Sequence, residues 1–413
     1  MRLRDLIPLS YKALLVNKAR TVLTMLGIII GIASVILMVS VGQAAQGYLL
    51  SQVASFGSDF IAVSNGKGDE TRGGGAPNPT VKQTLTLNDY RKLKNLTWPK
   101  GVSADLIARD LVSYGGVDTL TQVSGATPDD PIIYNETLKT GLYFSNEDVN
   151  SHTRVVVLGS KVADKLFGEE DSLGKTVKIT KQPFRVIGVL APAGTRFFSD
   201  ADDQVYIPVT AAMDLYNKTK VNYIGIKAGT SIPLAQGKEI VRVTLRAAHN
   251  IDNPTEDLAK DDFRVTTQDD AVQSVGAIGA VLQILLGSIA GISLVVAGVG
   301  IMNIMYVTVT ERTREIGLRK AIGAKSRDIL GQFLAEAIML TASAGALGII
   351  LGIAVSKLAI IIISQFQSGW TFAIPWNGAA IGFFVSAAIG IVFGYFPARK
   401  ASKLNPIEAL RYE

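Results

Sequence analysis

The sequence predicts an α-helical membrane protein with four transmembrane helices and one large α/β domain between the first and second helices. Three observations lead to this fold class. Four stretches are apolar and long enough to cross a bilayer, the residues between the first two are polar with short β-type runs, and Lys and Arg gather beside the apolar stretches. The 413 residues are 48% hydrophobic yet 18% charged, which fits a few spans combined with a sizeable aqueous domain.

Length identifies the four spans, because about 20 apolar residues are needed to cross the hydrocarbon core. The spans are Val22–Val41, Val275–Val309, Phe333–Ile363 and Ala379–Phe396. The first is a retained anchor and not a signal peptide, since its apolar run exceeds the ~7–15 residues of a signal h-region. The second run is about 15 residues longer than a span needs, which predicts a stalk that continues the helix. We therefore assign residues 22–48 to the first transmembrane helix with a stalk, and residues 271–309 to the second with its stalk. Residues 327–363 form the third helix and residues 376–397 the fourth.

Lys and Arg placement predicts the orientation, because basic loops stay cytoplasmic. Basic residues gather in an amphipathic arm at residues 1–21, in the loop after the second span and in the tail at residues 398–413. Both termini should therefore be cytoplasmic and residues 49–270 extracytoplasmic. Residues 42–274 hold 25 basic and 28 acidic side chains, so the net charge of +6 comes from the cytoplasmic segments and does not indicate nucleic-acid binding.

Glycine spacing suggests how the spans pack, since Gly-xxx-Gly lets helix backbones approach closely in lipid. We expect about half of the matches to be helix contacts. The motif occurs at Gly27/Gly31, Gly287/Gly291, Gly348/Gly352, Gly378/Gly382 and Gly390/Gly394.

The outer domain is predicted to consist of two β-α-β halves that flank an insertion. Short β-type runs separated by Gly, Pro, Asn and Asp predict its strands. The halves lie at about residues 49–118 and 213–270, and the inserted β-rich part at about 119–212. Inside the insertion, "SKVADKLFG" predicts a helix with Ser160 as its N-cap.

The chain carries no recognisable catalytic or nucleotide-binding motif. "GEEDSLGKT" is similar to a phosphate-binding P-loop, but five residues instead of four separate Gly168 from Gly174 and a strand follows, so we expect a β-turn. Cysteine is absent, and the contexts of His152 and His249 predict solvated or locally bonded side chains, not metal ligands. We expect neither a metal nor a cofactor on this chain.

The densest charged block lies between the second and third spans, in "VTVTERTREIGLRKAIGAKSRDILGQF". Glu315 and Arg319 have the favourable acid-first i,i+4 spacing, and Arg312 is placed to pair with Glu315 at i,i+3. Gly323 is positioned to end the helix. These features predict a short, rigid cytoplasmic helix at residues 310–326. Contact with anionic lipid would explain the basic residues but not the interleaved acids, so a docking surface for a cytosolic motor is the preferred interpretation.

This block, "GVGIMNIMYVTVTERTREIGLRKAIGAKSRDILGQFLAEA", resembles the signature of MacB/FtsX-like ABC transporter permeases. "NKARTVLTMLGIIIGIASVI" at the first span and "FGYFPARKASKLNPIEALRYE" at the end resemble the same family, and the resemblance covers essentially the whole chain. It implies a split porter-like outer domain with an inserted β-rich part, in a bacterial cytoplasmic membrane. It also implies that the block is the ATPase-coupling helix, with the residues Glu311, Arg312, Thr313, Arg314, Glu315, Ile316, Gly317, Leu318, Arg319, Lys320, Ala321 and Gly323.

The resemblance further implies partners and a mode of action. The family works as dimers that turn ATP hydrolysis into movement of the outer domains, so a second copy of the chain or a close relative is expected. MacB itself carries its ATPase ahead of the first span, whereas this chain starts about 20 residues before it. We therefore expect a separate ABC ATPase subunit that binds ATP and Mg, and consider a MacA-like adaptor as a further partner.

Several functions stay open at this point. Export of peptides, drugs or other lipophilic molecules is the leading interpretation. Lipoprotein extraction and FtsX-like control of cell-envelope enzymes are alternatives within the family. An ATP-independent receptor or scaffold is an alternative of a different class, as is an enzyme that acts through the outer domain.

One acidic residue, Glu336, lies inside the third span, about 11 Å along the helix axis at ~1.5 Å per residue. An ionisable group in a span is unfavourable and is a functional candidate by default. The preferred interpretation is a packed ion pair, with an arginine such as Arg312 or Arg399, or a hydrogen-bonded clamp at the base of the helix bundle. A proton relay or a solvated side chain are the alternatives.

Overall fold

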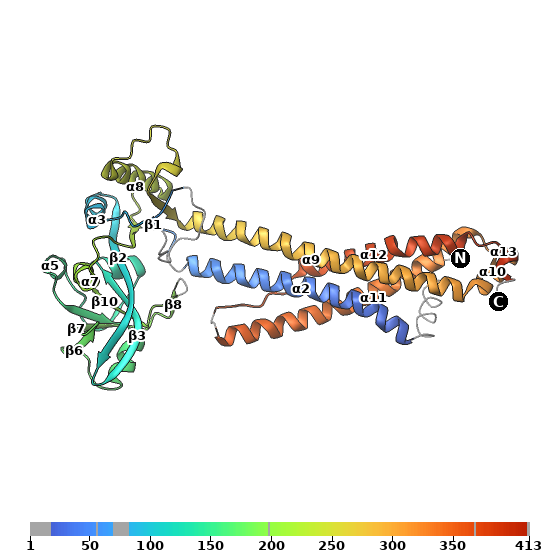
Figure 1. The fold of residues 1–413 in the computed structure, drawn as a ribbon, viewed down its shortest axis with the longest axis horizontal. Helices are drawn as coiled ribbons and strands as arrows, with labels where there is room; N and C mark the ends of the chain where they lie inside the picture. Colours follow the sequence, from blue (N-terminus) through green and yellow to red (C-terminus); the bar gives the residue numbers. More distant parts are fainter. Residues whose placement is uncertain (1–17, 55–56, 69–81, 197–198, 367–368, 411–413) are drawn as a thin grey trace. The chain divides into compact units, whose positions relative to one another are not determined.

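The structure, a computed structural model, describes residues 18–54, 57–68, 82–196, 199–366 and 369–410 (Figure 1). The chain forms two compact units, one from Met1–Tyr48 with Gly276–Glu413 and the other from Leu49–Val275. The first 17 residues of the amphipathic arm, which was expected at residues 1–21, lie outside the described residues.

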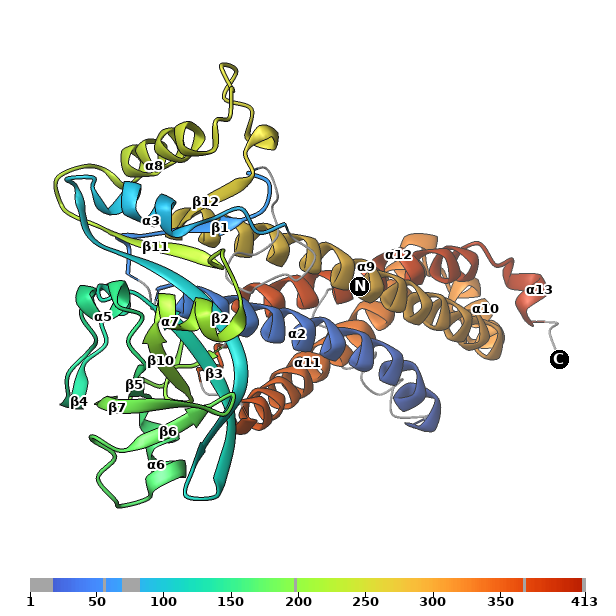
Figure 2. The same cartoon turned by 60° about the vertical axis from the view of Figure 1, so that its left-hand side comes forward.

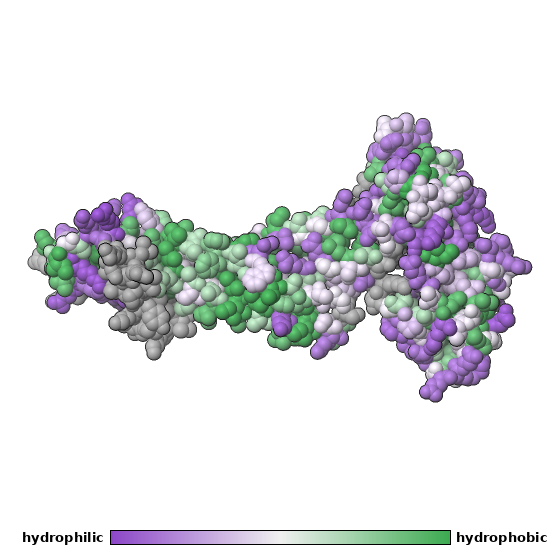
Figure 3. All heavy atoms as spheres, turned by 180° about the vertical axis from the view of Figure 1, so that it is seen from behind, coloured by the Kyte–Doolittle hydropathy of each residue, from purple (hydrophilic) through white to green (hydrophobic). Residues whose placement is uncertain are grey.

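The helical unit is built on four long helices, each apolar and long enough to cross a membrane. Figure 3 shows apolar residues over most of the visible surface of these helices, whereas hydrophilic residues dominate the visible surface of the other unit. The 44 residues of α9 extend ~66 Å, about twice the hydrocarbon core, so α9 is long enough for the expected stalk as well as a span. The helices are α2 (Lys18–Ala54), α9 (Gln268–Glu311), α11 (Ser326–Phe366) and α12 (Trp376–Ser402).

Close glycine contacts hold the four helices together. A Cβ added at Gly390 of α12 would lie 2.2 Å from Thr341 Oγ1, and one at Gly352 of α11 would lie 2.7 Å from the Cβ of Ile36 on α2. These backbones therefore approach more closely than a side chain would allow. Two of the five Gly-xxx-Gly motifs, Gly348/Gly352 and Gly390/Gly394, meet neighbouring helices in this way. At two more, Gly27/Gly31 and Gly378/Gly382, an added Cβ would lie 3.0–3.4 Å from a neighbouring helix. The fifth, Gly287/Gly291 on α9, has no described atom outside its own helix within 4 Å.

The α/β unit contains a ten-stranded mixed sheet among its described residues, with the strand order β12-β1-β11-β2-β3-β10-β5-β7-β4 and β6 paired with β2 and β7. Short strands β8 (Thr195–Arg196) and β9 (Ser199–Asp200) form a separate ribbon. The sheet strands are β1 (Phe60–Asn65), β2 (Pro99–Tyr114), β3 (Val117–Ala126), β4 (Leu138–Gly141), β5 (Val155–Leu158), β6 (Thr176–Ile179), β7 (Gln182–Leu190), β10 (Gln204–Pro208), β11 (Tyr223–Ala228) and β12 (Phe263–Thr267).

The long strand β2 belongs to two parts of this sheet. It pairs antiparallel with β11 up to Asp105 and with β3 from Leu106 onward (Figure 2). We call Pro99–Asp105 with β1, β11, β12 and the helices α3 (Leu87–Lys94) and α8 (Leu234–His249) the porter lobe. We call the rest of β2 with β3 to β7, β10 and the helices α5 (Asn146–Asn150), α6 (Ser160–Phe167) and α7 (Val209–Tyr216) the β-rich lobe. The partner of β2 thus changes between Asp105 and Leu106, ahead of the boundary that the sequence predicts near residue 118 between the first half of the domain and its insertion.

A short helix, α4 (Asp130–Tyr134), connects the two lobes. It follows β3 of the β-rich lobe in sequence, yet it packs against the porter strands. A Cβ at Gly101 of β2 would lie 3.4 Å from Ile132, and one at Gly225 of β11 would lie 3.3 Å from Ile133. The porter lobe and the insertion are therefore joined both by β2 and by α4.

The expected N-cap at Ser160 is wrong by one position. Ser160 is the first residue of α6, Gly159 occupies the cap position, and α6 has no side-chain cap. Instead, the N–H groups of Gly159 and Lys161 donate to the carbonyls of Gln204 (2.8 Å) and Asp202 (3.0 Å). A Cβ at Gly159 would lie 2.5 Å from the Asp202 carbonyl oxygen, so glycine is needed for this approach. The main chain around β10 replaces the side-chain cap.

The segment similar to a P-loop is a turn, as the sequence predicts. Gly174 has φ +74°, Lys175 pairs with the exposed Glu170, and strand β6 begins at Thr176. Both histidines are paired with carboxylates of the α/β unit. The exposed His152 lies 2.6 Å from Asp214, and His249 lies between two carboxylates.

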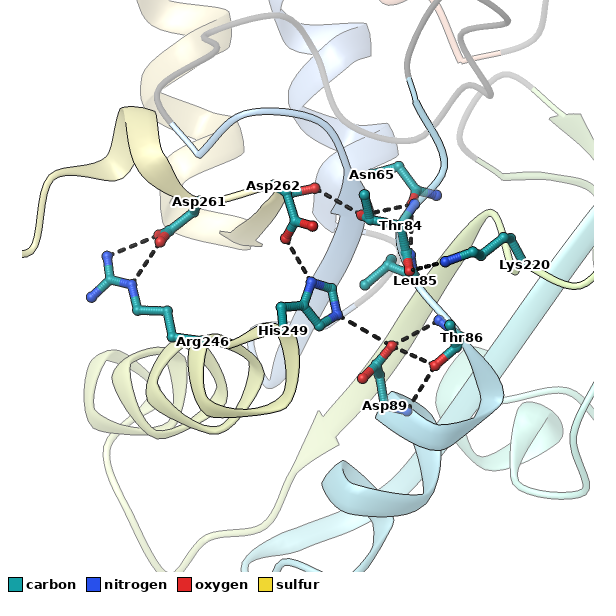
Figure 4. Close-up of polar contacts among 10 residues, drawn as sticks. All are labelled: Asn65, Thr84, Leu85, Thr86, Asp89, Lys220, Arg246, His249, Asp261 and Asp262. Carbon is teal, nitrogen blue, oxygen red and sulfur yellow. Dashed lines mark hydrogen bonds and ion pairs between the residues drawn. The ribbon is translucent and has the colours of Figure 1, made fainter. Parts of the chain in front are cut away.

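His249 ties together three parts of the porter lobe (Figure 4). Its Nδ1 lies 2.6 Å from Asp262 Oδ1, just before β12, and its Nε2 lies 3.3 Å from Asp89 Oδ2 on α3. Asp89 also completes the capping box of α3 with Thr86. Both ring nitrogens face carboxylates, so the protonated ring donates two charge-assisted hydrogen bonds. The hydrogen bond to Asp89, supported by that to Asp262, raises the pKa of His249 above its ordinary value.

We predict that His249→Gln weakens the porter lobe more at pH 6 than at pH 8.5. A folded-state pKa that is raised gives stability that is fully present below the unfolded value of about 6.5 and is lost as pH rises through the folded value. The expected loss at low pH is on the order of 1–2 kcal/mol, measured by thermal unfolding of the full chain in lipid nanodiscs. His152→Gln is the matched control, because its exposed pair should contribute little. An equal loss at both pH values would contradict the assignment.

Candidate functional site

The expected coupling helix is α10 (Thr313–Ala321), which lies between α9 and α11. Glu311 is the last residue of α9, and only Arg312 separates the two helices, so α10 begins three residues after the expected start at 310. Ile322 caps the C-terminus and Gly323 follows with φ +102°, the conformation that glycine provides most easily. α10 is therefore joined to both neighbouring helices by very short connections.

The inner face of α10 is apolar and closely packed. Ile316 is 2% exposed and belongs to the same buried cluster as Ile329 and Phe333 of α11. Gly317 faces a further short helix, α13 (Pro406–Leu410), and a Cβ at Gly317 would lie 2.7 Å from the Cβ of Ala409. Glycine at this position therefore allows α10 and α13 to pack together.

Two basic side chains fix α10 to its neighbours. Arg319 donates to Glu315 Oε1 within α10 and to Gln332 Oε1 of α11, both at 2.6 Å, which confirms the expected Glu315–Arg319 pair. Lys320 donates to the carbonyl of Ser402 at 2.9 Å and to that of Leu404 at 2.7 Å. These carbonyls are at the end of α12 and just beyond it, where helix carbonyls lack an intrahelical partner. Lys320 therefore binds α10 to the C-terminus of α12.

Arg312 makes a long-range contact in place of the expected local one. It was expected to pair with Glu315, but its Nη1 lies 3.3 Å from Glu336 Oε2 and 3.5 Å from Oε1. Glu336, on α11, is 5% exposed. Its ion pair with Arg312 confirms the first of the two arginine partners expected from the sequence. The pair connects the start of α10 to α11.

The outer face of α10 exposes apolar side chains beside charged ones. Leu318 is 56% and Ile322 79% exposed, and on the adjoining α13 Ile407 is 71% exposed. Arg314 and Ala321 are also exposed. We call Leu318, Ile322 and Ile407 the outer apolar patch. α10 thus has a packed inner face and an outer face with exposed apolar side chains.

Sequence reasoning missed α13, Gln332 and the role of Lys320 in this site. The start of α13 has a recognisable signal, because Asn405 precedes Pro406 and its Oδ1 accepts a hydrogen bond from Ile407 N–H at 3.2 Å. Lys320 has no comparable signal, since its acceptors are main-chain carbonyls. Among the described residues, no group of three or more His, Asp or Glu side chains is placed to hold a metal ion.

Two family models match this chain. The MacB-like periplasmic core domain matches residues 21–243, and the FtsX-like permease C-terminal model matches residues 287–406, which contain α10. This chain belongs to the family of MacB-like, FtsX-type ABC transporter permeases. Its four apolar helices and the periplasmic-type α/β domain between the first two fit a multi-pass inner-membrane protein.

Similar curated proteins extend beyond this chain. The macrolide export ATP-binding/permease protein MacB of Bdellovibrio bacteriovorus is 39% identical over 98% of this chain and 61% of its own length. The pyoverdine export ATP-binding/permease protein PvdT of Pseudomonas syringae pv. tomato is 38% identical over 100% of this chain and 60% of its own length. The chain thus spans about three fifths of these relatives. A solved structure, the periplasmic region of MacB from Actinobacillus actinomycetemcomitans, is 22% identical with a TM-score of 0.46, over 55% of this chain and 97% of that one.

We predict that Glu336→Ala destabilises the helical unit by roughly 2 kcal/mol, because it leaves Arg312 without its partner. Glu336→Gln should be milder, since the amide keeps an acceptor. Unfolding of the full chain in detergent micelles measures both changes. The exposed Glu315→Gln is the matched control, with an expected loss of about 0.3–0.5 kcal/mol.

The double variant Arg312→Ala with Glu336→Ala separates the ion pair from other effects. If the two groups interact, the double variant should lose less stability than the two single losses combined. Strict additivity would show that the two side chains do not stabilise one another.

Proposed function

We propose that this chain is the permease part of an ABC exporter, in which α10 receives force from a cytosolic ATPase and the long helices pass it to the extracytoplasmic domain. The observation that carries the proposal is the two-sided character of α10. Its inner side is fixed to α11, α12 and α13 by Arg319, Lys320 and Gly317, whereas the outer apolar patch stays exposed. A helix built in this way can be pushed from outside without moving independently of its neighbours.

The orientation follows from the same proposal. Both termini and α10 would face the cytoplasm of a bacterial cell, which is supported by the basic residues near the helix ends. ATP and Mg would be bound by the ATPase. We propose this ATPase as a separate subunit, and a MacA-like adaptor as a further partner on the other side of the membrane.

The proposed cargo is a peptide, drug or other lipophilic molecule. The names of the two relatives support export over the alternatives, since one is a macrolide exporter and the other a pyoverdine exporter. Which molecule this chain moves would be identified by comparing the compounds accumulated by cells with and without it.

We predict that Ile322→Asp weakens the ATPase complex at least tenfold while leaving the chain folded. Ile322 is 79% exposed, so the change should not disturb the core, but burying an isoleucine at an interface contributes about 1.5–3 kcal/mol. The measurement is ATP hydrolysis by the complex purified through a tag on this chain, with substrate export in the same cells. Val243→Asp, at a 62% exposed site on α8, is the matched control. Full ATPase activity and export in Ile322→Asp would refute docking at this face.

We also propose that two copies of the chain associate through α9. The motif Gly287/Gly291 is open among the described residues, while the other four motifs are filled by the chain itself. Around it, Ile284 is 70% and Ile292 68% exposed. An open small-residue motif on a membrane helix fits a second helix at close approach.

Single cysteines placed in Leu282–Val295 should therefore cross-link two copies in native membranes. The chain has no cysteine of its own, so each product reports on one position. Ile350→Cys, 65% exposed on α11, is the control and should give little product. A homodimer or a heterodimer with a close relative is then distinguished by the mass of the cross-linked species. Equal cross-linking at both helices would argue against a defined interface on α9.

A further inference from the structure

Helix α8 of the porter lobe carries four basic side chains on one face. They recur at steps of four, four and three residues, which is the spacing of a single face of an α-helix. They are Lys238, Arg242, Arg246 and His249. Each of them faces an acid that lies close to one end of strand β12. Asp261 and Asp262 directly precede β12, and Asp270 is the third residue of α9, which follows it.

The contacts ahead of β12 are buried and specific (Figure 4). Arg246 donates from Nε to Asp261 Oδ1 at 2.6 Å and from Nη2 to Oδ2 at 2.9 Å. Asp261 is 2% exposed, and Arg242 Nε lies 3.9 Å from its Oδ2. His249 Nδ1 lies 2.6 Å from Asp262 Oδ1. A bidentate pair of arginine and carboxylate has a fixed geometry, so the chain that enters β12 is held against α8.

A further contact lies beyond the end of β12, in the first turn of α9. Lys238 Nζ donates to the two carboxylate oxygens of Asp270, at 2.8 and 2.7 Å. The same carboxylate accepts from the main-chain N–H and the hydroxyl of Thr267, both at 2.8 Å, and so caps α9. β12 ends at Thr267 and α9 begins at Gln268, with no residue between them. α8 therefore binds the chain on both sides of β12.

Strand β12 depends on this support, because its own place in the sheet is weak. Among the described residues, β12 is an edge strand that pairs with β1 alone, over five residues. Ladder hydrogen bonds hold such a strand on one side only. α8, in contrast, is packed into the lobe. Val241 and Leu245 are buried in its core, and a Cβ at Gly237 would lie 3.1 Å from the ring of Trp98. The ion pairs thus connect β12 and the start of α9 to the body of the lobe.

We propose that the basic face of α8 is the joint that makes the porter lobe follow α9. This inference rests on the proposed function, in which the long helices carry force from α10. A pull on α9 reaches α8 through Lys238 and Asp270, while the Arg246–Asp261 pair keeps β12 from sliding along β1. Lys238 is therefore a positioning residue for transport. Without it, the spans would still respond to ATP, but the lobe would no longer follow α9 closely.

The joint can be tested by measuring a distance across it in the full chain with its ATPase. Spin labels on cysteines at Val243 of α8, 62% exposed, and Ile278 of α9, 51% exposed, report this distance in lipid nanodiscs. The chain has no native cysteine to interfere. In the wild type, the distance distribution should be narrow and the same with and without ATP, because α8 and α9 move together.

Lys238→Met should widen this distribution roughly twofold, and more strongly with ATP, because the start of α9 is then free to move. The rate of ATP hydrolysis should stay at the wild-type level, since α10 is unchanged. Folding should be little affected, because the side chains of Lys238 and Asp270 are 21% and 33% exposed. Lys238→Arg keeps the charge and should behave as the wild type. Lys161→Met, which removes an exposed ion pair with Asp200 in the β-rich lobe, is the matched control.

Asp270→Asn tests the same contact from the other side. Its amide oxygen can still accept from Thr267, so the cap of α9 is kept while the charge is lost. This variant decides the matter if Lys238→Met does not fold. If the two side chains act together, the double variant should widen the distribution no more than the stronger single variant does. Additive effects would show that Lys238 does not act through Asp270 and would overturn the proposal.

Failure of the joint is distinguishable from failure of the proposed function. If the wild-type chain supports no ATP hydrolysis by a partner, the proposed function is refuted, whereas the distributions without ATP still decide whether Lys238 holds α9 to α8. The joint is refuted if the wild-type distribution changes with ATP, or if Lys238→Met leaves the distribution as it is. An equal effect of Lys161→Met would also refute it.

Discussion

The fixation of α10 to its neighbours is the constraint on which the proposed force transmission depends. A docking helix can move the spans only if it does not rotate or bend by itself. Arg312 at its start binds Glu336 of α11, and Lys320 at its end binds two carbonyls at the C-terminus of α12. Because the ties at the two ends reach different helices, they resist rotation as well as displacement. The close approach at Gly317 adds α13 to the same joint. Three of the six basic residues of this block, Arg312, Arg319 and Lys320, therefore act inside the protein, and the apolar patch stays exposed.

Much of this site could be predicted from the sequence, because its signals are local. Apolar length gives the spans, Gly323 gives the end of α10, and the i,i+4 spacing gives the pair of Glu315 with Arg319. The contacts that were missed depend on residues far along the chain. Arg319, for example, also donates to Gln332 of α11, which no local spacing indicates. The pair of Arg312 with Glu336 was expected from the position of an acid inside a span, whereas local spacing favoured Glu315 instead. A sequence pattern does not show which main-chain carbonyls a lysine will find at the end of another helix.

The α/β domain shows the same division between local and tertiary information. The strands and helices of both halves follow from their β-type runs and turn residues, but the division between the lobes does not. β2 looks uniform along its length, and only pairing with β11 and then β3 divides it at Asp105. Likewise, a serine ahead of a helix is a sound cap prediction, yet main-chain carbonyls around β10 accept the hydrogen bonds at the start of α6, so that Gly159 occupies the cap position. Asp105 and Asp130 resemble ordinary surface acids in sequence, because their burial depends on α4 packing against strands from the other lobe.

The buried acids of this protein are surrounded in different ways. In the helical unit, the buried Glu336 is paired with the guanidinium of Arg312, a group that stays charged throughout the physiological pH range. In the α/β domain, the buried Asp130 instead accepts hydrogen bonds from the neutral hydroxyls of Ser103 and Tyr143. The charged pair suits a joint that has to stay stiff, as the proposed transmission of force through α10 requires.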